Sequence, residues 1–156
     1  MKTLIAVALV ATLTACGGGS DSADETGVVR IEPSGATDAT LAYRLSLRAK
    51  APVHVAAEQL TVSLQDIVDS RCPAGVTCVA AGAATVKLDV TLPGVVPETA
   101  HIELSLDAAK PAADSAKLRD YRLVLRALSP MPPAAGAQLS DYTATVELQK
   151  LKSSST

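Results

Sequence analysis

Apolar and polar residues alternate with period two along most of the chain from Val28 onward. Such alternation puts one face of a strand in a core and the other in water, which is typical of antiparallel sheets. The pattern is clear in six segments, residues 41–47, 60–65, 86–92, 102–106, 121–126 and 142–148. Shorter segments at 28–32 and 52–57 bring the expected number of strands to about eight.

Turns that carry Pro and Gly separate these segments, and the sequence shows no internal repeat. We therefore predict an all-β fold, an antiparallel β-sandwich of about seven to eight strands that is Ig-like in general architecture. A small β-barrel is the alternative. Residues 107–117 are expected to form a loop or one frayed helical turn, because Pro111 interrupts any longer helix.

The aromatic content defines the expected core. The protein has no Trp, no Phe and three Tyr, so Val, Leu, Ile and Ala must fill the interior. Tyr43, Tyr121 and Tyr142 fall on the apolar sides of their strands and are expected in the core, with the Tyr142 hydroxyl bonded to a nearby backbone carbonyl. A formal net charge of −2 and the shortage of aromatic rings argue against a surface that binds nucleic acid.

The first residues have the layout of a secretory signal peptide. Lys2 supplies a positive start, and the apolar run Leu4–Leu13 is too short to span a bilayer core of about 30 Å. The run ends in Leu-Thr-Ala-Cys, with the Cys at position 16, which resembles the lipobox of bacterial lipoproteins. The resemblance implies cleavage before Cys16, acylation of that residue and anchoring in the cell envelope. An ordinary signal peptide is the alternative.

This interpretation divides the chain into a signal peptide (1–15), a lipidated flexible tether (16–26), a β-sandwich domain (27–152) and a disordered tail (153–156). In the lipobox family, an Asp after the Cys tends to retain the protein at the inner membrane. Gly17 occupies that position here. The resemblance therefore implies the outer membrane, with the domain facing the periplasm or the cell surface.

Cys72 and Cys78 remain once Cys16 is assigned to the lipid. An even number of Cys outside the cytoplasm is typical of a disulfide, and a loop this short gives a stabilisation of about 2 kcal/mol. A metal site is the competing interpretation. It would need two further ligands and a closer spacing of the two Cys.

Residues 66–82, DIVDSRCPAGVTCVAAG, form the one distinctive motif. They resemble a motif of small secreted or lipid-anchored bacterial proteins of unassigned function, D-S-R-C-P followed after a few residues by V-x-C-x-W-A-G. The matching positions are Asp69, Ser70, Arg71, Cys72, Pro73, Val76, Cys78, Ala81 and Gly82. Ala80 stands where that family has Trp. The resemblance implies a β-fold and an envelope location, and it brings no activity.

The motif has two interpretations. In the first it has a structural role and fixes the connection between two strands. Pro73 and Gly75 suit a tight turn, and the Asp69 carboxylate accepts backbone N–H bonds or pairs with Arg71. In the second it is a displayed recognition loop with Arg71 at its tip. The residues of this candidate binding loop are Asp69, Ser70, Arg71, Pro73 and Gly75.

Candidate catalytic residues are few. His54 lies on a polar strand face with Glu58, and His101 lies on one with Glu103 and Ser105. Neighbours on one strand face lie about 7 Å apart, too far for a direct relay. The sequence contains no nucleophile, metalloprotease or phosphate-loop motif, so we expect no enzyme.

Asp66 and Asp69 lack the series of spaced oxygens that a calcium loop needs, and we expect neither a metal site nor a cofactor. The sequence thus predicts a membrane-anchored envelope lipoprotein with a non-enzymatic β-domain that binds another protein or has a structural role. An apolar or Arg-bearing patch is expected at one end of the sandwich, beside residues 69–82. A periplasmic small-molecule or metal carrier and a protease inhibitor are the alternatives.

Overall fold

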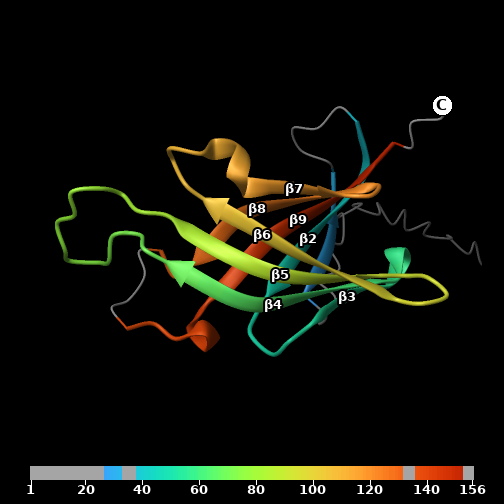
Figure 1. Ribbon diagram of the computed structural model, residues 1–156, viewed down its shortest axis with the longest axis horizontal. Coiled ribbons are helices and arrows are strands. Elements are labelled where there is room, and N and C mark those ends of the chain that lie inside the picture. Colours follow the sequence, from blue (N-terminus) through green and yellow to red (C-terminus); the bar gives the residue numbers. More distant parts are fainter. Residues whose placement is uncertain (1–26, 33–37, 132–135, 153–156) are drawn as a thin grey trace, which may run out of the picture.

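The computed structural model describes residues 27–32, 38–131 and 136–152. These residues form nine strands in two antiparallel sheets, with three short 3₁₀ helices (Figure 1). The five-stranded sheet has the order β1 (Val28–Ile31), β2 (Ala39–Leu47), β9 (Thr143–Leu151), β8 (Tyr121–Ser129) and β7 (Ser115–Leu118). The four-stranded sheet has the order β3 (Val53–Val55), β4 (Leu60–Asp69), β5 (Ala84–Leu92) and β6 (Glu98–Leu106). The 3₁₀ helices are η1 (Ala56–Glu58), η2 (Pro111–Asp114) and η3 (Leu139–Asp141). Two separate sheets that share one core confirm the predicted all-β sandwich and not the small β-barrel that was its alternative.

The core lies between the two sheets and consists mainly of the alternating aliphatic residues. On β5, for example, every second residue from Ala84 to Leu92 is buried, whereas Lys87 between them is exposed. Burial of one Val or Leu side chain contributes about 1.5–3 kcal/mol, so a strand with this pattern is held firmly in one register. Tyr43 and Tyr142 are buried in this core, as predicted.

A β-bulge in β4 changes which of its residues face the core. The pairing with β5 shifts between Leu64 and Asp66, and one inserted residue moves the following side chains to the opposite faces. After the bulge, Val68 is exposed, and the Asp69 side chain is only 3% exposed. The bulge therefore turns Asp69, the first of the matching motif positions, inward.

Residues 107–117 differ in part from the prediction. Pro111–Asp114 forms η2, a single short helical turn within the range where a loop or one such turn was expected. The expectation of a loop was wrong for residues 115–117, which belong to the edge strand β7 (Ser115–Leu118) and pair with β8. Four residues are too few to show a period-two pattern, and pairing with β8 decides their conformation.

Two connections lie at opposite ends of the sandwich (Figure 1). At one end, residues 70–83 connect β4 to β5 and extend beyond the sheets; we call them the disulfide loop. At the other end, residues 93–97 connect β5 to β6; we call them the hairpin turn. Within the described ranges, no helix is long and apolar enough to cross a membrane.

Candidate functional site

The disulfide loop begins as a continuation of the β4–β5 pairing. The Ser70 amide donates to the carbonyl oxygen of Ala83 at 2.8 Å, and the Cys72 amide donates to that of Ala81 at 3.2 Å. The Ser70 hydroxyl donates to the Ala83 carbonyl at 2.9 Å, and the Ala83 amide donates to the same hydroxyl at 3.1 Å. These bonds hold the two arms of the loop together at its base and account for Ser70 in the motif.

Gly82 is required by the closeness of the two arms. Its φ is +69°, a left-handed conformation that side chains disfavour. A Cβ at this position would lie 1.9 Å from the carbonyl oxygen of Ser70. The motif's glycine thus allows one backbone to approach the other.

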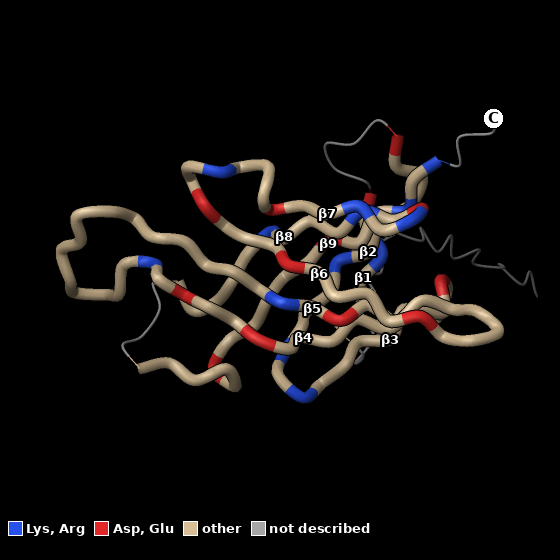
Figure 2. Tube along the Cα trace, viewed as in Figure 1, with Lys and Arg blue, Asp and Glu red and all other residues tan. Residues whose placement is uncertain are grey.

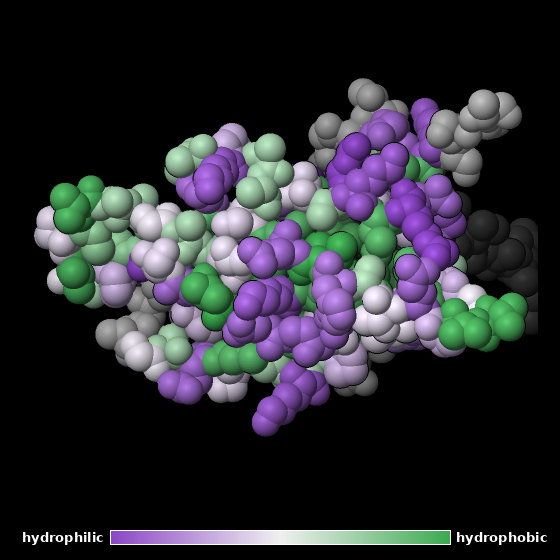
Figure 3. Space-filling view, viewed as in Figure 1, coloured by the Kyte–Doolittle hydropathy of each residue, from purple (hydrophilic) through white to green (hydrophobic). Residues whose placement is uncertain are grey.

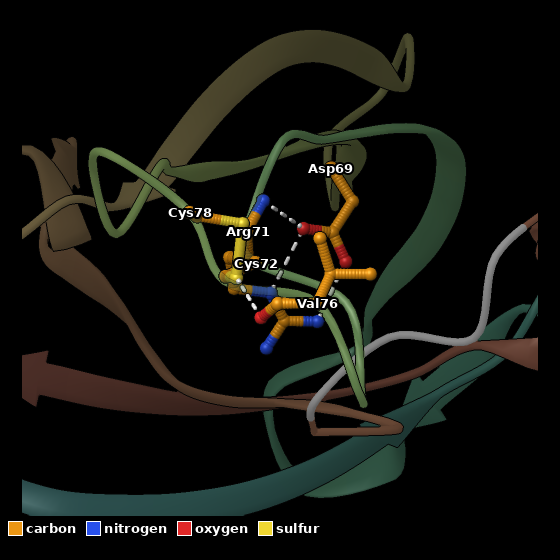
Figure 4. Close-up of a disulfide and its surroundings, with 5 residues drawn as sticks. All are labelled: Asp69, Arg71, Cys72, Val76 and Cys78. Carbon is orange, nitrogen blue, oxygen red and sulfur yellow. Dashed lines mark hydrogen bonds and ion pairs between the residues drawn. A yellow bond between two sulfur atoms is a disulfide. The ribbon is translucent and has the colours of Figure 1, made fainter.

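The disulfide closes the loop beyond this paired base (Figure 4). Cys72 and Cys78 are bonded, with their Cα atoms 5.9 Å apart, as predicted. Within the ring they close, the Val76 amide donates to the Pro73 carbonyl oxygen at 3.4 Å, and Gly75 has a φ of +75°. Pro73 and Gly75 therefore shape the tight turn that the sequence predicted.

Asp69 and Arg71 form a buried ion pair at the base of the loop (Figure 4). Asp69 Oδ1 accepts hydrogen bonds from Arg71 N at 3.0 Å and Arg71 Nε at 2.9 Å, and Oδ2 accepts one from Nη2 at 2.7 Å. The side chains of Arg71 and Asp69 are 10% and 3% exposed. Burial by itself raises the pKa of Asp69, but the hydrogen bonds and positive charge of Arg71 bring it below its ordinary value.

The same guanidinium connects the loop to the other sheet. Arg71 Nη1 donates to the carbonyl oxygen of Leu128 at 3.0 Å, and Nη2 donates to that of Pro130 at 3.0 Å. The Tyr142 hydroxyl lies near the Asp69 carboxylate, and burial together with this negative charge raises the pKa of Tyr142. The pair thus connects the end of β4 to the end of β8.

Two sequence predictions are corrected here. Arg71 lies at the base of the loop and not at its tip, because the bulge in β4 turns Asp69 inward and a buried carboxylate requires a cation. The Tyr142 hydroxyl lies near that carboxylate, and within the described ranges it forms no hydrogen bond with a backbone carbonyl. The prediction that Asp69 accepts a backbone N–H and pairs with Arg71 is confirmed.

The outer part of the disulfide loop is apolar and exposed. No charged residue lies between Arg71 and Lys87 in the sequence, and Figure 2 shows the projecting loop without charge. Val76 is 57% exposed and Val79 is fully exposed, and hydrophobic residues gather at this end of the surface in Figure 3. Ala80, the position at which the similar motif has Trp, is also exposed and lies on the loop surface and not in the core.

A pocket of about 540 Å³ lies beside the base of the loop. Cys72, Ala81 and Gly82 of the loop form part of its wall, and residues 105–108, at the end of β6 and just after it, form another part with η2. Its lining is mostly apolar, and it includes Asp107 and Asp114. The loop and the pocket together form a continuous surface at this end of the sandwich.

The two histidines lie elsewhere, on the four-stranded sheet. His54 Nδ1 is 3.2 Å from Thr61 Oγ1, and His101 Nδ1 is 2.6 Å from Asp89 Oδ1, with the His101 ring largely exposed. His101 therefore pairs with a residue of the neighbouring strand and not with Glu103 on its own strand.

The two carboxylates considered as calcium ligands form ion pairs with two different basic side chains. Asp66 pairs with Lys87 at 3.0 Å, and Asp69 pairs with Arg71. The described residues contain no group of three or more His, Cys, Asp or Glu that could hold a metal ion. Cys16, the predicted lipidation site, lies outside the described residues, as do the predicted signal peptide, tether and tail.

Sequence reasoning missed a second buried carboxylate, at the hairpin-turn end. Glu58 was assigned to a polar strand face, but it is buried and accepts hydrogen bonds from Tyr121 at 2.8 Å, Tyr43 at 3.4 Å and Lys150 at 2.7 Å. Burial alone raises its pKa, and these bonds bring it below its ordinary value, whereas burial and Glu58 raise the pKa of Tyr121. The available signal was that two core tyrosines need buried partners for their hydroxyls.

Comparison of the chain with protein-family models, with curated proteins and with solved structures found no match. The functional argument therefore depends on the geometry of the disulfide loop and the pocket beside it.

Proposed function

We propose that this protein is a lipid-anchored lipoprotein of the bacterial envelope whose β-sandwich, without enzymatic activity, presents the disulfide loop to a protein partner. One observation carries the proposal: an uncharged loop with exposed valines extends from a base held by a buried ion pair, a disulfide and backbone hydrogen bonds. A loop needed only to connect two strands would not require an apolar, exposed tip.

The physical advantage of such a loop is its order before binding. A flexible segment loses conformational entropy when a partner fixes it, by about 0.5–1.5 kcal/mol for each immobilised side chain. The ring closed by Cys72 and Cys78 and the anchoring through Arg71 reduce that loss. Burial of the valine side chains at the tip would then supply about 1.5–3 kcal/mol each.

The location is proposed from the lipobox-like sequence that ends at Cys16, and from Gly17, which favours the outer membrane. The Cys72–Cys78 disulfide supports it, because disulfides persist in oxidising compartments outside the cytoplasm. The carrier alternative needs a chamber between the sheets, where the described core is packed with aliphatic side chains. A protease inhibitor would be one form of the proposed protein-binding role.

A pull-down from detergent-solubilised envelope tests the proposal. The bait is the full chain, either wild type or with Val76→Ser and Val79→Ser at the loop tip. The matched control carries Val95→Ser and Val96→Ser, which replace two exposed valines on the hairpin turn. Circular dichroism establishes that each bait is folded.

We expect a specific protein to be captured by the wild type and the hairpin-turn variant and lost with the loop-tip variant. If all folded baits capture the same proteins, or if only the hairpin-turn variant loses them, the disulfide loop is not the binding element.

A further inference from the structure

The pocket beside the disulfide loop has the size and lining of a binding site. Its volume of about 540 Å³ falls in the range of about 300–1,000 Å³ that is common for ligand pockets. Leu106, Pro111 and Met131 are among the apolar residues of its wall. Met131 is itself largely exposed at this edge. An aliphatic group placed here would bury this apolar surface together with its own.

Negative charge predominates among the residues that line the pocket. Asp107 and Asp114 line it, and neither forms an ion pair with any residue that the structure describes. Asp107 Oδ1 accepts the Ala109 amide at 2.8 Å, which leaves its second oxygen available. Arg71 also lines the pocket, but its charge is neutralised by Asp69. The pocket therefore carries two negative charges that are not balanced by its own lining.

We propose that this pocket receives an aliphatic side chain of the partner protein that is adjacent in sequence to a Lys or Arg. The aliphatic group contacts the apolar wall, and the cation pairs with Asp107 and Asp114. This inference deepens the proposed function and rests on it, because the pocket shares Cys72, Ala81 and Gly82 with the base of the disulfide loop. A partner that covers the loop therefore also reaches the pocket.

The inference is tested in two steps. First, the hexapeptides Gly-Ser-Leu-Lys-Ser-Gly and Gly-Ser-Leu-Glu-Ser-Gly, with blocked ends, are titrated into ¹⁵N-labelled protein, and amide shifts are followed by NMR. The variant with Asp107→Asn and Asp114→Asn removes both charges and keeps the side-chain oxygens. The control is Glu103→Gln, an exposed acid on β6 that lies outside the pocket lining. Second, the same variants serve as baits in the envelope pull-down.

We expect the Leu-Lys peptide to shift amides of residues 105–114 and to bind about ten-fold more tightly than the Leu-Glu peptide. The double Asn variant should lose that preference, and Glu103→Gln should keep it. In the pull-down, the double Asn variant should capture less of the partner than Glu103→Gln does.

Equal binding of the two peptides, shifts confined to other parts of the protein, or capture that is unchanged in the double Asn variant would overturn the inference. If the peptides discriminate as expected but no partner depends on the loop valines, the proposed function fails and the chemistry of the pocket stands.

Discussion

Substitution of Gly82 by Ala tests the account of how the disulfide loop is held. The left-handed conformation costs an L-residue about 1–2 kcal/mol, part of which is offset by the lower entropy of the unfolded chain. The new Cβ would also lie 1.9 Å from the carbonyl oxygen of Ser70, so the two arms must separate. Separation breaks the bonds between Ser70 and Ala83, each worth about 0.5–1.5 kcal/mol net.

The matched control is Gly75→Ala. Gly75 has a similar φ of +75°, but a Cβ there meets nothing within 4 Å. We therefore expect Gly82→Ala to lower the free energy of unfolding by about 3–4 kcal/mol and Gly75→Ala by about 1 kcal/mol. The difference between them measures the close approach of the arms alone.

Urea unfolding provides the assay, with the m-value checked for constancy. Hydrogen exchange of the Ser70 and Cys72 amides detects separation of the arms that occurs without global unfolding. The reasoning is refuted if the two variants are equally stable within about 0.5 kcal/mol and exchange these amides at the same rate.

The remaining predictions concern the buried charges and the anchor. Arg71→Ala leaves the Asp69 carboxylate buried without its cation and should lower the free energy of unfolding in urea by about 3 kcal/mol. Arg122→Ala removes the more exposed pair with Asp38 and should lower it by less than about 1 kcal/mol. Similar losses in the two variants would contradict the buried role of Arg71. Glu58 has a lowered folded pKa, so its contribution to stability is present above about pH 4.5 and is lost as the pH falls through that folded pKa. The difference in unfolding free energy between pH 7 and pH 3 should therefore be smaller in Glu58→Gln than in the wild type, and an unchanged difference would refute this. Cys16→Ser should move the protein from the detergent phase to the aqueous phase in Triton X-114 partitioning, and retention in the detergent phase would argue against lipidation.

The period-two pattern was enough to predict the class of fold and the positions of the longer strands. Each of these strands has several aliphatic residues on one face, and their burial outweighs local alternatives. The edge strand β7 was missed because its four residues contain too little of the pattern, and its conformation depends on pairing with β8.

The sequence predicted part of the framework of the candidate site, but not its geometry and not the exposed valines at its tip. The disulfide and the Asp69–Arg71 pair follow from residue types and spacing. The bulge between Leu64 and Asp66 does not, because it depends on how β4 pairs with β5, and it decides that Arg71 lies at the base. The pocket could not be predicted from the sequence either, because segments that are far apart in the chain, from β6, η2 and the disulfide loop, form its wall together.

Glu58 shows a different reason for failure. Its position beside His54 in the sequence suggested a shared polar face, but η1 and the left-handed Gln59 redirect the chain after β3. The turn brings Glu58 to the hydroxyls of two tyrosines on the other sheet. This contact depends on how the two sheets pack, so the sequence pattern does not predict it.

The central claim, that the tip of the disulfide loop contacts a protein partner, is tested most directly by photo-crosslinking in intact cells. The photoreactive residue p-benzoylphenylalanine is placed either at Val79, on the loop, or at Val95, on the hairpin turn, both of which are fully exposed. The account predicts one discrete adduct from position 79 and none from position 95. An adduct only from position 95, or no adduct from position 79 in folded, membrane-associated protein, would contradict it.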